Sequence, residues 1–239
     1  MRSAIFNPDL AGSADCRTGR MNRALQIGLV AVALLWPRAG LAQGPATSTE
    51  SVAEALAAKE SWQFSLMVDG YIVPKEQGYA SPVFTADHDW LHLEARYDDE
   101  NLHTGSLWVG YNFTVGKKLV LTVTPMVGGV FGRTTGVAPG CDASLTYKKL
   151  EFSISNEYVF DTGSKAGNMY TGWPEVTYSL LDWLKLGLAA QRTKAYRTAV
   201  ATDRGFLVGV SHRKIEFTTY VLNAGWTDPT VILEMGYQF

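Results

Sequence analysis

The chain has 239 residues, a formal net charge of −2 and two cysteines, Cys16 and Cys141. Its Lys and Arg residues do not form a basic patch of the density that nucleic-acid binding needs, so a nucleic-acid partner is excluded. After residue 42, no apolar run reaches the roughly 18 residues that a membrane-spanning helix requires.

Residues 21–42 have the parts of a secretory signal peptide. A basic segment at 21–23 precedes an apolar stretch at 24–36, and Leu41-Ala42 resembles a small-residue cleavage site. Residues 1–20 read as an upstream extension, because Met21 is the more natural start. Cleavage after Ala42 would leave 16 basic and 21 acidic residues and a single cysteine, so no intramolecular disulfide is expected.

Residues 43–61 are predicted to form a periplasmic linker or a short helix. Gly44 and Pro45, followed by Ser and Thr residues, are typical of a linker. Ser51 and Glu54 have the spacing of a capping box, which would start a helix. Both alternatives stay open.

From Trp62 to the C-terminus, short segments alternate between apolar and polar residues. In residues 91–98, Leu, Leu, Ala and Tyr alternate with His, Glu, Arg and Asp. The same period of two recurs around residues 62–72, 107–113, 119–128, 150–160, 176–180, 184–191, 206–210 and 215–223. Alternation of this kind predicts strands with one apolar and one polar face.

The connections between these segments alternate in length. The short ones are residues 116–118, 147–149, 181–183 and 212–214, and the longer ones are residues 98–104, 132–137, 161–170, 196–203 and 223–229. Short turns on one side and longer loops on the other are typical of a transmembrane barrel. The strand at 62–73 needs a return partner, which the weak segment 81–87 can supply, so about twelve strands are predicted. Ten would result if the first 88 residues formed a plug or a periplasmic piece.

The chain ends on Phe239, with Tyr237, Met235, Leu233 and Val231 at every second position before it. This ending resembles the C-terminal strand of bacterial outer-membrane β-barrels, which typically finish on Phe. For this segment alone the alternative is an edge strand of a soluble sandwich, but a sandwich needs neither this ending nor the leader.

The resemblance is to the barrel class as a whole and not to a subfamily. It implies an all-β fold, a transmembrane antiparallel up-and-down β-barrel over residues 62–239, located in the bacterial outer membrane. It also implies contact with outer-membrane lipid, and recognition of Tyr237 and Phe239 as an assembly signal by the barrel-assembly machinery. We expect a monomer.

The phase of the strands places a mainly acidic set of side chains in the lumen. These are Asp69, His92, Glu94, Arg96, Glu151, Glu157, Glu175, Lys185, Gln191, Glu216 and Glu234. A twelve-strand barrel is too wide for side chains alone to fill easily, which favours a water-filled path.

We therefore expect a passive channel for small hydrophilic solutes with a mild preference for cations. The predicted pore-lining residues are Glu94, Arg96, Glu151, Lys185 and Glu216. The alternative is a lumen filled by ion pairs, in a structural or adhesive barrel whose loops at 98–104 and 161–170 contact a partner.

An enzymatic function is less favoured. His92, Glu94 and Ser106 could imitate a Ser-His-acid set, as in barrel lipid hydrolases, but His92 and Ser106 face the lumen, whereas such sets usually face lipid. The sequence has neither HExxH nor CxxC, so no metal site and no cofactor are predicted.

Overall fold

A computed structural model describes residues 61–239, except residues 75–76, 164–166, 196–199 and 226–227. Residues 1–60 lie outside the described part of the chain. The predicted upstream extension (1–20), signal peptide (21–42) and linker or short helix (43–61, except Ser61) therefore lie outside the described residues. Among the residues that are described, no helix is long and apolar enough to cross a membrane.

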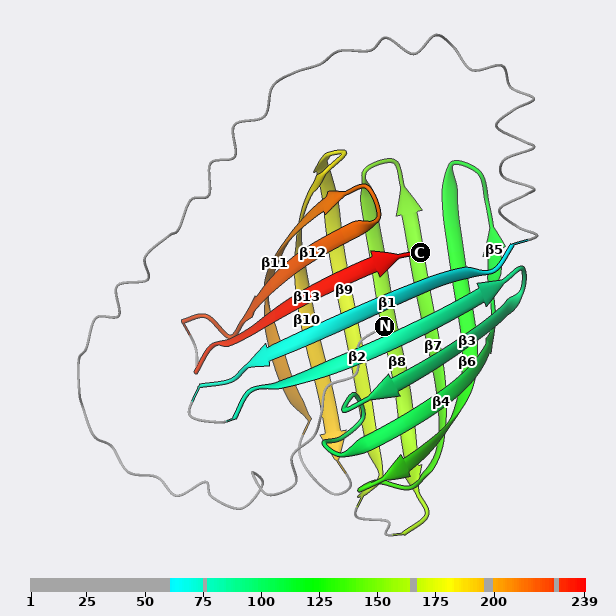
Figure 1. The fold of residues 1–239 in the computed structure, drawn as a ribbon. Coiled ribbons are helices and arrows are strands. Elements are labelled where there is room, and N and C mark those ends of the chain that lie inside the picture. Colours follow the sequence, from blue (N-terminus) through cyan, green and yellow to red (C-terminus); the bar gives the residue numbers. More distant parts are fainter. Residues whose placement is uncertain (1–60, 75–76, 164–166, 196–199, 226–227) are drawn as a thin grey trace, which may run out of the picture.

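The described chain forms one antiparallel sheet that closes on itself (Figure 1). Its strands are β1 (Gln63–Ile72), β2 (Tyr79–His88), β3 (Leu91–Tyr97), β4 (Thr104–Tyr111), β5 (Phe113–Val115), β6 (Leu119–Gly132), β7 (Gly136–Tyr147), β8 (Leu150–Asp161), β9 (Met169–Leu181), β10 (Leu184–Ala195), β11 (Ala201–His212), β12 (Ile215–Leu222) and β13 (Thr230–Gln238). Because β4 and β5 both pair with β6, they are two parts of one barrel strand. The predicted twelve-strand up-and-down barrel is confirmed. The ten-strand alternative is wrong, since β1 and β2 are part of the barrel wall.

The first and last strands close the barrel. In the β1–β13 pair, Leu66 lies opposite Tyr237 and Val68 lies opposite Met235. The pairing extends to the last residue, where the backbone N–H of Phe239 donates to the carbonyl of Phe64 at 3.0 Å. Closure leaves no open sheet edge among the described strands, and every wall strand has two neighbours.

Tight turns join the strands at one end of the barrel, here called the turn end. Two residues separate β2 from β3, β7 from β8, β9 from β10 and β11 from β12. Asp89, Lys148 and Arg213 have positive φ in three of these turns, as two-residue hairpins with a matching twist require. The opposite end, here called the loop end, carries most of the longer connections. One predicted long loop, residues 132–137, is wrong: only three residues separate β6 from β7.

The outer and inner faces differ in chemistry as the alternation predicted. Leu107 and Leu188 point outward and are 60% and 66% exposed, whereas Trp108 points inward and is 3% exposed. The interior also contains apolar side chains, packed in the half of the barrel nearer the loop end. One cluster is Tyr71, Trp173, Ala189, Leu207, Tyr220, Leu222 and Ile232. A second is Trp108, Met126, Val130, Ala138, Val159 and Met169.

Candidate functional site

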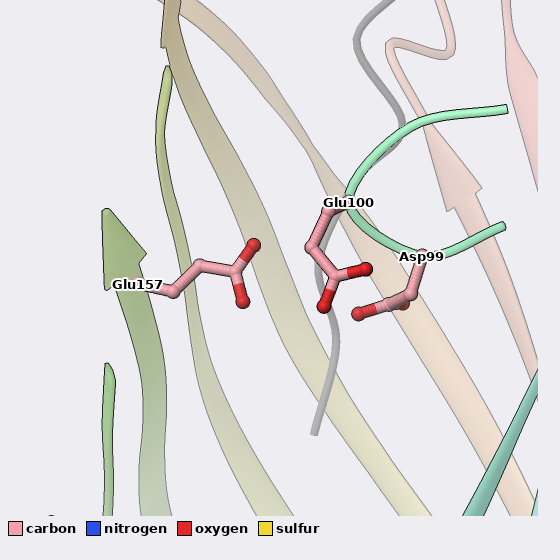
Figure 2. A group of neighbouring side chains, drawn as sticks. All are labelled: Asp99, Glu100 and Glu157. Carbon is pink, nitrogen blue, oxygen red and sulfur yellow. The ribbon is translucent and has the colours of Figure 1, made fainter. Parts of the chain in front are cut away.

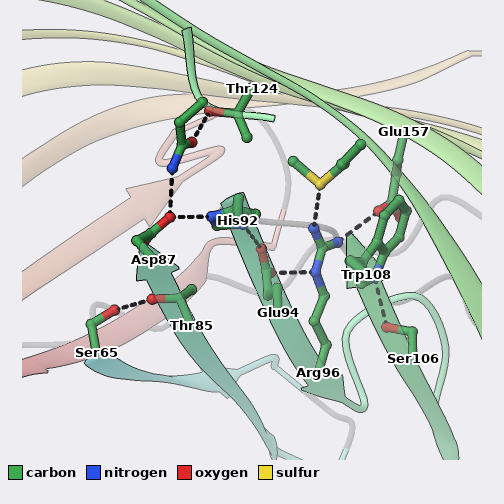
Figure 3. A network of polar contacts seen from close by, with 12 residues as sticks. Ser65, Thr85, Asp87, His92, Glu94, Arg96, Ser106, Trp108, Thr124 and Glu157 are labelled. Carbon is green, nitrogen blue, oxygen red and sulfur yellow. Dashed lines mark hydrogen bonds and ion pairs between the residues drawn. The ribbon is translucent and has the colours of Figure 1, made fainter. Parts of the chain in front are cut away.

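Arg96 is the centre of a buried polar network inside the barrel (Figure 3). Its Nε donates to Glu94 Oε1 at 2.5 Å. Its Nη1 donates to Glu157 Oε2 at 2.8 Å and to Asp99 Oδ2 at 3.2 Å. The guanidinium also lies 4.3 Å from the ring centroid of Trp108. These contacts compensate a buried positive charge, which would otherwise be strongly unfavourable in the interior.

His92 extends the network across the neighbouring strands. Its Nδ1 lies 2.7 Å from Asp87 Oδ1, and its Nε2 lies 3.1 Å from Glu94 Oε2. Asn112 donates to the same Asp87 oxygen at 2.7 Å and accepts from Thr124 Oγ1 at 2.8 Å. The chain of contacts therefore links strands β2, β3 and β6.

The connection between β3 and β4, residues 98–103, folds into the barrel. Its Asp99, Glu100 and Asn101 are buried. Trp108 Nε1 donates to Glu100 Oε1 at 3.2 Å, and the Ser106 hydroxyl donates to the same oxygen. Asn101 donates to Thr134 Oγ1 at 3.0 Å. This inward-folded loop narrows the lumen near the loop end, and its buried side chains are not displayed to an external partner.

Three carboxylates gather where this loop meets β8. The carboxylate oxygens of Asp99, Glu100 and Glu157 lie within 4.8 Å of one another, with the Glu100 carboxylate between the other two (Figure 2). Burial raises the pKa of the Asp99 carboxyl well above its usual range, the Glu100 and Glu157 carboxylates raise it further, and Arg96 opposes them. The spacing would suit a divalent cation, but the Arg96 guanidinium already supplies a positive charge to all three.

A cavity of about 350 Å³ lies in the half of the lumen nearer the turn end. Its charged lining residues are Asp142, Glu175, Lys185, Glu216 and Glu234. Lys185 Nζ donates to Glu216 Oε1, and Trp173 Nε1 donates to Glu175 Oε1 at 2.5 Å. Four acids therefore share the cavity with one base, and the wall carries an excess of negative charge.

The structure separates the predicted pore-lining residues into three places. Glu94 and Arg96 lie in the buried network, whereas Lys185 and Glu216 line the cavity as an ion pair. Glu151 is exposed near the turn end and accepts from Thr146 Oγ1 at 3.3 Å.

Sequence reasoning missed several residues of this interior, including Asp87 and two groups with a clear cause. The first is Asp142 on β7, where Gly, Ala and Pro residues hide the alternation between polar and apolar positions. Asp142 shares the inward face of β7 with Gly140 and Ser144. Because these neighbours are small, the sequence does not show that the Asp142 side chain points into the lumen until the position and register of β7 are known. Asp99 and Glu100 form the second group, because a polar loop sequence gives no signal that the loop folds inward.

The residues that could imitate a catalytic set have other partners. Both ring nitrogens of His92 lie beside carboxylates, those of Asp87 and Glu94. The Ser106 hydroxyl donates to Glu100, and in the β3–β4 register Ser106 lies opposite Arg96, whereas His92 lies opposite Gly110. The structure therefore does not bring Ser106 and His92 together as a nucleophile and its base.

A closed antiparallel barrel with an apolar outer face and a polar interior defines the class of outer-membrane β-barrels. Comparison with solved structures agrees. The barrel is similar to the KdgM porin, with a TM-score of 0.51 and 11% identity over 73% of this chain and 99% of that chain. It is also similar to the NanC porin, with a TM-score of 0.53 and 16% identity over 73% of this chain and 98% of that chain. At these identities the similarity establishes the fold. No protein-family model matches the sequence, and no curated protein matches it significantly.

Proposed function

We propose that this protein is a passive channel of the bacterial outer membrane for small hydrophilic solutes, with a mild preference for cations. The observation that carries the proposal is the acid-lined cavity inside a barrel of porin fold. In this arrangement the loop end faces the outside of the cell and the turn end faces the periplasm, as is usual for bacterial barrels.

The cation preference follows from the charges on the inner wall. The acidic residues of the strands that face inward are Asp69, Asp87, Glu94, Asp142, Glu151, Glu157, Asp161, Glu175, Asp203, Glu216 and Glu234. The inward-facing Lys and Arg residues of the described strands are Arg96 and Lys185. A negative wall in a confined aqueous path attracts cations and repels anions, so width and charge together would select the solute.

The test is electrical. The chain from residue 43 onward is refolded and inserted into a planar bilayer with a salt gradient across it. Steady conductance steps with a reversal potential on the cation-selective side would support the proposal. Anion-selective steps would reject the cation preference, and a correctly inserted but silent barrel would reject the channel.

A plugged structural barrel is the second candidate, and one observation favours it. Packed side chains fill much of the interior near the loop end, where both apolar clusters and Arg96 with its partners Asp99 and Glu157 lie. If this packing is complete, the barrel would insert without conducting, and the same bilayer experiment separates the two functions.

A further inference from the structure

The outer face of the described strands carries one group of charged side chains. Residues that alternate with the lumen-facing ones point outward, as the exposure of Leu188 and Phe206 shows for β10 and β11. Among the outward-facing residues of the described strands, the only Lys, Arg, Asp or Glu side chains are Arg192, Lys194 and Arg204. All three are basic and exposed, and we call them the basic cluster.

The register places these three residues close together. Ala190 pairs with Arg204 and Arg192 pairs with Thr202, so Arg192 and Arg204 are diagonal neighbours on adjacent strands. Such neighbours lie roughly 7–8 Å apart at the backbone, within reach of one another's long side chains. Lys194 follows on the same face of β10, nearer the loop end.

An apolar groove of about 490 Å³ begins beside the basic cluster and runs toward the turn end. Its outward-facing walls are Pro174, Val176, Leu188 and Phe206, and Ala190 and Gly205 leave the space between them. Arg204 also lines the groove, so charge and apolar surface are continuous.

We propose that the basic cluster and this groove bind a phosphorylated glycolipid of the outer leaflet. The phosphate would accept from the two guanidinium groups and the ammonium group, and an acyl chain would lie along the groove. Arginine suits phosphate because its planar fork can donate two parallel hydrogen bonds. The inference rests on the proposed outer-membrane location, but not on conduction.

The direction of the site matches a lipid of the outer leaflet. The basic residues lie nearer the loop end, and the groove extends from them toward the middle of the wall. Leu188 and Arg192 are four residues apart on β10, which is roughly 13 Å along a strand. A lipid of the outer leaflet has its headgroup at the outer surface and its acyl chains directed toward the middle of the membrane, which is the same order as the basic cluster and the groove. A lipid of the inner leaflet has the opposite orientation.

The test compares two lipid probes on the full barrel by native mass spectrometry in mild detergent. The probes are lipid A with two phosphates and the same lipid without phosphate. The variant combines Arg192→Gln, Lys194→Gln and Arg204→Gln. The matched control combines Lys117→Gln, Lys118→Gln and Lys214→Gln, which removes three charges from exposed turns at the opposite end.

The native barrel should bind the phosphorylated probe more tightly than the unphosphorylated one. The triple variant should lose roughly a hundredfold in affinity, because each basic residue beside an anionic headgroup contributes about fivefold. The control should bind like the native barrel. Equal binding by the triple variant, or equal binding of both probes by the native barrel, would overturn the proposal.

Two further measurements keep the result interpretable. Heat-modifiable migration on a gel shows whether each variant is folded, and the single variant Arg192→Gln replaces the triple one if the latter does not fold. Conductance of the triple variant should be unchanged, since the basic cluster faces away from the lumen. Loss of lipid binding with normal conductance separates this inference from the channel proposal.

Discussion

At the scale of single residues, the charge of the cavity wall is the feature that most directly affects solute selection. Glu175 and Glu216 lie on different strands of the cavity wall, and Lys185 is the one base among its lining residues. The native wall therefore has an excess of carboxylates, whose removal should be measurable without altering the barrel wall itself.

Replacing Glu175 and Glu216 together by Gln should reduce the cation preference, because two negative charges leave the cavity wall while side-chain volume is nearly kept. The measurement is the reversal potential under a salt gradient, which should move toward zero. Asp89→Asn is the matched control, since it removes a charge from an exposed turn and Asn tolerates the positive φ at that position. An unchanged reversal potential in the double variant would contradict the assigned role.

Asp99 gives a second prediction, on the pH dependence of stability. Its raised pKa means that the folded barrel holds this proton more tightly than the unfolded chain does. The contribution of Asp99 to the free energy of unfolding is therefore greatest below the ordinary Asp pKa of about 3.9. This contribution is lost as the pH rises through the raised pKa of the folded barrel. Asp99→Asn mimics the protonated form and should remove this loss.

The measurement is the unfolding temperature of native barrel and variant between pH 4 and pH 9. The advantage of Asp99→Asn should grow as the pH rises across this range. A constant difference across this range would show that Asp99 is not held in its protonated form by its surroundings.

At the scale of elements, the inward-folded loop places its buried side chains Asp99, Glu100 and Asn101 in the lumen near the loop end. Its contacts to Ser106, Trp108 and Thr134 fix it against the wall. If solutes pass this point, the loop sets the resistance of the path.

Replacing three residues of this loop, as Asp99→Gly, Glu100→Ser and Asn101→Gly, should raise the single-channel conductance, because the buried side chains that narrow the lumen are removed. A matched variant in the β6–β7 connection, Arg133→Ser, removes an exposed side chain and should leave conductance unchanged. Equal conductance in native and loop variants would place the resistance elsewhere.

The C-terminal strand supports a prediction about assembly. Phe239 is 59% exposed, and its ring lies 5.0 Å from that of Tyr237 and 6.5 Å from that of Phe84. Because the β13 ladder ends beside it, Phe239→Ala removes little packing from the folded barrel. We expect less heat-modifiable barrel in outer membranes of cells, where assembly requires recognition of the strand, but near-normal refolding in detergent. Equal loss in both settings would indicate a structural role only.

Most of the strands could be predicted from the sequence because a barrel wall imposes strict alternation, but β7, where Gly, Ala and Pro interrupt the alternation, is not among the predicted segments. The weak segment 81–87 is a strand as predicted, and the paired closure of β1 with β13 follows from the twelve-strand count. The interior could be predicted less well. Alternation places Tyr220 and Ile232 on the inner face but does not indicate that they pack into an apolar cluster. The inward fold of residues 98–103 depends on contacts between side chains far apart in the sequence, such as Asn101 with Thr134.

At the scale of the whole molecule, the two halves of the lumen differ. The half nearer the turn end contains the acid-lined cavity and the His92 end of the buried network. The half nearer the loop end contains Arg96 with its partners Asp99 and Glu157, the inward-folded loop and the apolar clusters. An acidic cavity behind an outer section that side chains and the inward-folded loop obstruct would admit only small solutes and favour cations.

The most direct measurement is the single-channel conductance of the refolded barrel in a planar bilayer under a salt gradient. We expect small, steady conductance steps whose reversal potential shows cation selectivity. A barrel that inserts and shows the heat-modifiable shift of a folded protein, yet passes no current, would contradict it.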